Sequence, residues 1–220
     1  GAVLLSLPIS SATGTSTNFL DAYFTANSAT CVTGLVALDT GTHFSLFGLI
    51  VLIVLMQIGG LGYMTFSVFM VLVLRKKMFV SERIMAQEAL NIYSGKETAG
   101  ILKKIFSIVF AVEGAGAIIL FLRWLPEMGS GKALFYAIFH AVSAFNNAGF
   151  ALPANFANMM PYVTDIVINL TLTTLIIIGG IGFMVINELI SRRKISLHSK
   201  IVLSTTAFLL LFGTIAFLLV

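Results

Sequence analysis

Long apolar runs alternate with short polar segments along the chain. Residues 44–74, 105–125, 162–190 and 201–220 each meet the roughly 20 residues that a helix needs to cross a membrane. A straight helix of about 30 residues is about 45 Å long and exceeds a hydrocarbon core of about 30 Å, so the longer runs must tilt, kink or break. Glycine clusters near their middles favour either a break or close helix packing: Gly59, Gly60 and Gly62, then Gly179, Gly180 and Gly182.

The chain also repeats itself. The glycine clusters recur at an offset of 120 residues, and six upstream identities recur at an offset of 115: Ala22/Ala137, Phe24/Phe139, Ala26/Ala141, Ser28/Ser143, Ala29/Ala144 and Gly34/Gly149. Each unit predicts a short semi-polar helix, a glycine-containing turn, a loop and a long helix. A helix over about residues 19–29 would be roughly 16 Å long, enough to enter a bilayer halfway and return.

Composition and charge predict that the chain lies in a membrane, and in which orientation. Hydrophobic residues make up 58% of the 220 and charged residues 10%, with mean hydropathy +1.03, which excludes an ordinary soluble globule. Eleven of the thirteen Lys and Arg residues lie in two clusters, within 75–104 and 192–200. The positive-inside rule places both clusters in the cytoplasm, so the net charge of +4 reflects orientation and predicts no nucleic-acid partner.

The two turns carry the candidate chemistry. Neither has an acidic side chain, and they comprise Cys31, Val32, Thr33, Gly34 and Leu35, then Asn146, Asn147, Ala148, Gly149 and Phe150. Backbone carbonyls must therefore bind any cation there, and Gly34 and Gly149 allow successive carbonyls to face one axis. The carboxyl end of the preceding helix also favours a cation. The alternative is an ordinary glycine turn, but two turns in matched contexts favour a selectivity filter.

With these turns the chain resembles the Trk/Ktr/HKT superfamily of potassium transporters. Residues 28–35 look like the first pore loop and residues 143–150 like the second, while the glycine-rich helices and residues 81–91 are similar to the bacterial Ktr-type membrane subunit. The resemblance implies an all-α integral membrane protein of parallel helix/pore-loop/helix repeats, as in potassium channels. It further implies multi-pass insertion in the cytoplasmic membrane, contact with lipid, and potassium uptake.

In such a pore the filter carbonyls hold K⁺, and the resemblance implies no organic cofactor and no enzymatic activity. Sodium-permeable or sodium- or proton-coupled transport within the same superfamily is the alternative. In the family, two whole subunits form a homodimer on a cytosolic nucleotide-binding ring. Residues 75–104 are the expected contact with that ring, or simply a solvated amphipathic helix.

The repeats divide the chain into four parts. Residues 1–77 form a first repeat that lacks most of its first helix, with pore helix and filter at 19–35 and a long helix at 44–74. Residues 78–104 form a cytoplasmic connection. Residues 105–194 form the second repeat, with a helix at 105–125, pore helix and filter at 133–150 and a long helix at 162–190; residues 195–220 begin a third. A fourfold filter needs four loops, so we expect about two of four repeats, with both ends cut; assembly from two copies is the alternative.

Two polar residues, Glu113 and His140, lie inside apolar segments, and we interpret the role of each separately. Glu113 lies about 12 Å into its predicted helix, where a charge is costly. Since Arg123 is ten residues away on the same helix, we expect Glu113 to hydrogen-bond to another helix rather than to conduct ions. His140 is expected to pack, or to bond to loop backbone, rather than bind metal, because His43 and His198 share no ligand spacing with it.

Three residues near the turns keep two interpretations each. Asp39 and Asp165 flank the expected extracellular mouths, where they either raise the local cation concentration or are merely solvated. The Thr33 hydroxyl either joins the filter or stabilises the turn. An intramembrane enzyme would need a nucleophile with a base, or a metal with its ligands, at one depth, and these scattered residues do not supply one.

Overall fold

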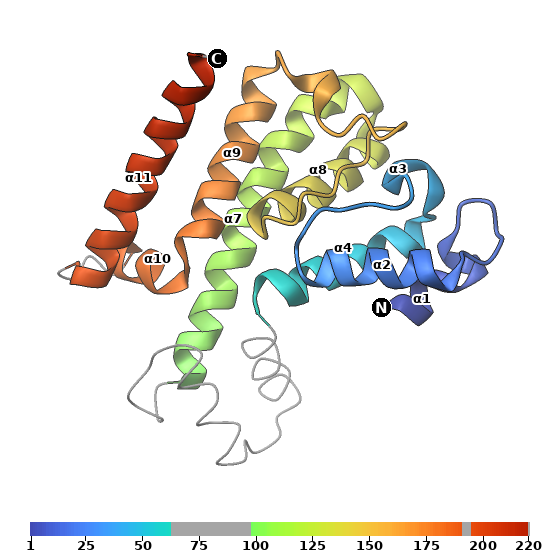
Figure 1. Ribbon diagram of the computed structural model, residues 1–220, viewed down its shortest axis with the longest axis horizontal. Coiled ribbons are helices and arrows are strands. Elements are labelled where there is room, and N and C mark those ends of the chain that lie inside the picture. Colours follow the sequence, from blue (N-terminus) through green and yellow to red (C-terminus); the bar gives the residue numbers. More distant parts are fainter. Residues whose placement is uncertain (63–97, 191–194, 220) are drawn as a thin grey trace.

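The computed structural model describes residues 1–62, 98–190 and 195–219, and within these ranges it is helical with no strand. Figure 1 shows the helices in two groups whose intervening loops run alongside each other. The elements are α1 (Ala2–Ser6), η1 (Pro8–Ser10), α2 (Phe19–Thr30), α3 (Thr40–His43), α4 (Leu46–Gly60), α7 (Thr98–Met128), α8 (Ser130–Phe145), η2 (Met160–Tyr162), α9 (Ile166–Ile181), α10 (Phe183–Ile190) and α11 (Leu197–Leu218).

The first group packs α2 against α4, with α1 beside both (Figure 1). Asn18 caps α2 by accepting a hydrogen bond from the Leu20 N–H, and Ser45 caps α4 by accepting one from the Gly48 N–H. Small residues on α2 and larger ones on α4 fill the interface: Ala22 and Ala26 lie with Leu52 and Met56 in one buried cluster. The short helix therefore lies close along the long one.

The second group is built on α7, whose 31 residues span about 46 Å. Both α8 and α9 pack on it, and Figure 1 shows α7 and α9 side by side. Trp124 is fully buried at this junction, with its ring edge-on to those of Tyr136 and Tyr162. Helix α8 thus packs against both α7 and α9.

The glycine clusters serve both of the roles that the sequence left open. A Cβ on Gly59 would overlap the Thr30 carbonyl at the end of α2, and a Cβ on Gly179 would overlap the Phe145 carbonyl at the end of α8. These glycines therefore allow α4 to touch the end of α2, and α9 to touch the end of α8. The break comes later, at Gly182, whose φ of 92° separates α9 from α10.

Several boundaries differ from those predicted. Helix α7 begins at Thr98 rather than at residue 105, because charged residues end an apolar run without ending a helix. Residues 98–104, the end of the predicted cytoplasmic connection, are therefore helical. Helix α8 begins at Ser130 rather than at residue 133. Residues 63–97 and 191–194 lie outside the described ranges. The rest of the predicted 44–74 helix and most of the 78–104 segment fall there. So do eight of the basic residues, at positions 75–77, 83, 96 and 192–194.

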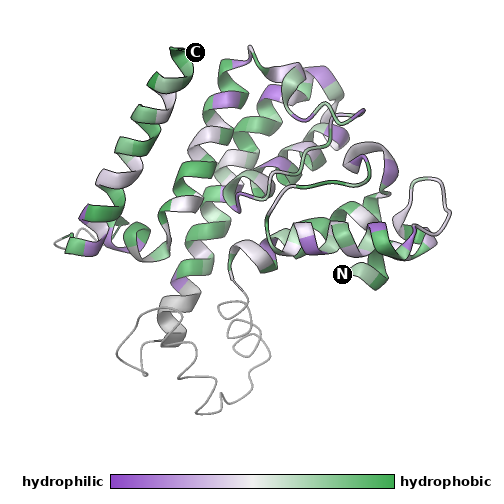
Figure 2. Ribbon diagram, viewed as in Figure 1, coloured by the Kyte–Doolittle hydropathy of each residue, from purple (hydrophilic) through white to green (hydrophobic). Residues whose placement is uncertain are grey.

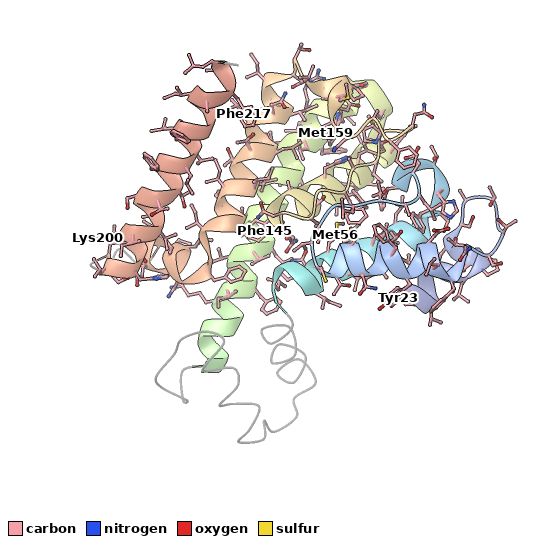
Figure 3. The ribbon with its side chains drawn as sticks, viewed as in Figure 1. Tyr23, Met56, Phe145, Met159, Lys200 and Phe217 are labelled. Carbon is pink, nitrogen blue, oxygen red and sulfur yellow. The ribbon has the colours of Figure 1, made fainter. Side chains whose placement is uncertain are left out.

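Hydrophobic residues predominate along most of the helices (Figure 2), and many large apolar side chains are exposed. Within the described ranges, two helices are long and apolar enough to cross a membrane, Lys104–Met128 and Leu197–Leu218. Helix α11 exposes large apolar side chains along its length, and Figure 3 shows Lys200 and Phe217 near its opposite ends. These surfaces need a cover other than water.

We predict that Gly59→Ala and Gly179→Ala each destabilise the full-length protein by about 1–3 kcal/mol, because the added methyl overlaps backbone that cannot rotate away. Gly114→Ala is the matched control, since this helical glycine has nothing within 4 Å of an added Cβ. Melting temperatures in detergent would measure the effects. Equal stability of all three variants would contradict the packing role of Gly59 and Gly179.

Candidate functional site

The turns after α2 and α8 share one backbone geometry. We refer to residues 31–35 as loop 1 and residues 146–150 as loop 2. Val32 and Asn147 have φ of 49° and 57°, and Gly34 and Gly149 have φ of 72° and 75°. Matched hydrogen bonds close both helices, 3.0 Å from Thr33 N–H to the Ser28 carbonyl and 2.8 Å from Ala148 N–H to the Ser143 carbonyl. This is a Schellman-type ending, which needs a left-handed residue after the helix.

The two loops meet at their glycines. A Cβ on Gly34 would lie 2.8 Å from the Ala148 carbonyl oxygen and 3.1 Å from the Gly149 Cα. A Cβ on Gly149 would lie 3.2 Å from the Gly34 Cα. Both glycines also line a cavity of about 80 Å³, together with Asp39 and Asn158. Because the two loops touch at their glycines, any ion passage lined by both loops would have to run along one side of this contact.

One face of α8 holds the segment that follows loop 2. Ser143 donates its hydroxyl hydrogen to the Phe150 carbonyl at 2.7 Å, and Tyr136 donates to the Leu152 carbonyl at 3.1 Å. His140 accepts from the Leu152 N–H at 3.2 Å through Nε2, while its Nδ1 lies 2.8 Å from the Tyr136 carbonyl. Nδ1 must therefore carry the proton of a neutral imidazole. The expectation that His140 bonds to loop backbone is confirmed.

Loop 1 is held by a hydrogen bond to the helix that precedes it. The Thr33 hydroxyl donates to the Ser28 hydroxyl at 2.9 Å, across the turn that ends α2. Of the two interpretations of Thr33, the structure therefore supports stabilisation of the turn. Cys31, at the end of the helix, is exposed.

Loop 2 is held from outside. Ala148 stands where loop 1 has Thr33 and offers no hydroxyl, whereas Asn146 is buried where loop 1 has the exposed Cys31. The Asn146 amide nitrogen lies 3.1 Å from Glu113 Oε1 and 3.2 Å from Gln57 Oε1. Glu113 therefore bonds to another helix, as expected. The role of Gln57 was missed, although a polar residue within an apolar run was a signal.

Asp39 and Asp165, the acids expected at the extracellular mouths, interact with other groups of the protein. Asp39 accepts a hydrogen bond from the Asn155 N–H at 2.6 Å and so joins the segments that follow the two loops. Asp165 caps α9 by accepting from the Ile168 N–H at 3.0 Å, and it pairs with Arg123 at 2.6 Å. These acids thus brace the structure, and neither is merely solvated.

The other candidate ligands do not gather. His43 lies 2.9 Å from the Thr17 hydroxyl, far along the chain from His140. Within the ranges that the structure describes, no three side chains of His, Cys, Asp or Glu are placed to share a metal ion.

Comparison with known proteins identifies the relatives of this chain. Residues 3–220 match the family model described as TrkH, cation transport protein. The chain is 47% identical to Ktr system potassium uptake protein B of Bacillus subtilis, covering 95% of this chain and 47% of that protein. It is 44% identical to the protein of the same name from Vibrio alginolyticus, covering 98% of this chain and 48% of that protein.

A third relative has a broader name. Potassium/sodium uptake protein NtpJ of Enterococcus hirae is 42% identical, over 100% of this chain and 49% of its own length. The chain thus spans about half the length of the curated relatives it matches.

Asp165 supports a prediction about the structural role of the acids. Arg123→Ala should cost the full-length protein about 0.2–1 kcal/mol, because the arginine is partly exposed and the ion pair is screened. Asp165→Ala should cost about 1 kcal/mol more, since it also removes the helix cap. Asp165→Asn keeps a capping oxygen and should resemble Arg123→Ala. Thermal unfolding would measure this order, and equal losses for the Ala and Asn variants of Asp165 would refute the capping role.

Proposed function

Since the chain belongs to the TrkH family of cation transport proteins, we propose that it supplies two loops of a potassium-uptake pore in the cell membrane. The observation that carries this proposal is the shared left-handed geometry of Gly34 and Gly149, which meet at one place. The family is one of cation transporters rather than of enzymes.

The loops suit a cation whose hydration shell is replaced by carbonyl oxygens. Neither loop has an acidic side chain, and both follow the carboxyl end of a helix, whose dipole favours positive charge. The proposed ion ligands are backbone carbonyls of residues 31–35 and 146–150. The Phe150 carbonyl already accepts one hydrogen bond, from Ser143, which leaves it one lone pair for an ion.

Membrane insertion is supported by the outer helix faces. Helices α7, α9 and α11 expose large apolar side chains such as Ile118, Leu170 and Phe208, which lipid or further transmembrane helices would cover. We place α7, α4, α9 with α10, and α11 across the bilayer, with α2 and α8 entering it and returning through loops 1 and 2. Irregular backbone at that depth is tolerated where it is buried in protein or lines a water-filled cavity.

The complete pore needs more than these two loops, because Gly34 and Gly149 touch and leave no passage between them. We propose that two further loops of the same kind close the ring. The resemblance to the Trk/Ktr/HKT superfamily suggests that the whole subunit forms a homodimer on a cytosolic nucleotide-binding ring, and the name 'Ktr system' of two relatives supports a system of several components.

Transport of sodium as well as potassium is the second candidate. It is favoured by the relative named as a potassium/sodium uptake protein, which is 42% identical to this chain. A sodium-permeable pore and a sodium- or proton-coupled transporter would use the same loops, so ion selectivity distinguishes the candidates better than further structure.

We predict that Gly149→Ser in the full-length protein lowers the ratio of rubidium to sodium uptake at least about tenfold, equivalent to about 1.4 kcal/mol. The serine strains a backbone with φ of 75° and crowds Gly34. Gly129→Ser is the control, because that glycine has the same φ of 75° but nothing within 4 Å of an added Cβ. Uptake in a potassium-auxotrophic host would measure the ratio. An unchanged ratio in Gly149→Ser would remove loop 2 from the filter.

We also expect the 220-residue chain alone not to conduct. Purified chain in liposomes should show no rubidium flux above that of empty liposomes, whereas the full-length protein should. Flux through the chain alone would show that a pore forms without further loops from a longer protein.

A further inference from the structure

Glu113 is a buried acid that the proposed ion path does not use. It lies on α7, 5% exposed, and shares a largely apolar cavity of about 520 Å³ with Gln57 of α4. Burying a carboxyl group is unfavourable unless it is hydrogen-bonded. Its partner is the amide of Asn146, the residue that ends α8 and begins loop 2.

Asn146 joins three helices at the start of loop 2. Its amide nitrogen lies 2.9 Å from the Val142 carbonyl of α8, in addition to its contacts with Glu113 of α7 and Gln57 of α4. Gly60 of α4 makes room for it, because a Cβ there would overlap the Asn146 side chain. The side chain is therefore held on two sides by hydrogen bonds and on a third by packing.

The loops differ in how they are fixed, although their backbones match. Loop 1 is held internally by the Thr33 and Ser28 hydroxyl groups. In loop 2 the corresponding serine, Ser143, bonds to the Phe150 carbonyl, since Ala148 has no hydroxyl to offer it. At the start of loop 2, Asn146 is in addition fixed by side chains of α7 and α4.

We propose that Glu113 is a positioning residue for loop 2, which holds Asn146 by a hydrogen bond and thereby sets the cation selectivity of the loop. This inference rests on the proposed function of the loops as a filter. Glu113 acts through Asn146 and does not touch the ion. Loss of the Glu113 oxygen leaves the Asn146 amide with only the Gln57 and Val142 oxygens as acceptors, which loosens the turn.

The test measures the ratio of rubidium to sodium uptake, per amount of membrane-inserted full-length protein. Glu113→Ala and Asn146→Ala should each lower the ratio about tenfold, the scale set by loss of one buried hydrogen bond. The double variant should be no worse than Asn146→Ala alone, because that substitution already removes the hydrogen bond to Glu113. Glu113→Gln keeps an accepting oxygen and should retain the ratio to within about threefold.

Two other variants separate the possible explanations. Val109→Ala, at a fully buried apolar position on α7, should lower protein abundance without changing the ratio. Gly149→Ser reports on the filter itself. If Gly149→Ser changes the ratio and Glu113→Ala does not, Glu113 has no positioning role and the loops remain a filter; if neither does, both proposals fail.

A ratio for Glu113→Gln as low as that for Glu113→Ala would also overturn the inference, since the effect would then lie in the charge rather than in the hydrogen bond. If Glu113→Ala does not reach the membrane, Asn146→Ala carries the test. An unchanged ratio in that variant would refute the link between Asn146 and loop geometry.

Discussion

The whole arrangement depends on backbone approaching backbone where α2 and α8 end. Gly59 lets α4 touch the last carbonyl of α2, Gly179 lets α9 touch the last carbonyl of α8, and Gly34 and Gly149 let the two loops touch each other. Any side chain at these four positions would push neighbouring backbone away. The loops meet at one point because each contributes a glycine to the contact between them. A further glycine, in α4 or α9, lies against the end of the helix that precedes each loop.

Within this symmetric backbone, the supporting polar groups differ. Thr33 and Ser28 hold loop 1 from within, whereas Asn146, Glu113 and Gln57 hold loop 2 through neighbouring helices. In the proposed pore, loop 2 is therefore coupled to the long helix of the first repeat, and loop 1 has no matching link among the described residues. Disturbance of α4 or α7 should accordingly be felt in loop 2.

The internal repeat predicted which residues would share a conformation, because Gly34 and Gly149 stand at one offset and do share a left-handed φ. The same φ at Val32 was not predictable, since a β-branched residue disfavours it and only the helix ending imposes it. The partner of Glu113 was equally hidden, because residues 57, 113 and 146 are far apart in sequence. Asp39 and Asp165 were predicted to act on ions or to be solvated, but both accept hydrogen bonds within the protein, Asp39 from a residue 116 positions away.

The central claim is that backbone carbonyls of loops 1 and 2 bind the transported cation. Crystals of the full-length protein grown in rubidium would test it directly, because the anomalous signal of rubidium locates the ion without assumptions about the protein. We predict a rubidium peak next to Gly34 and Gly149, with carbonyl oxygens as its protein ligands. Rubidium bound only elsewhere, or coordinated at these loops by side chains, would contradict the claim.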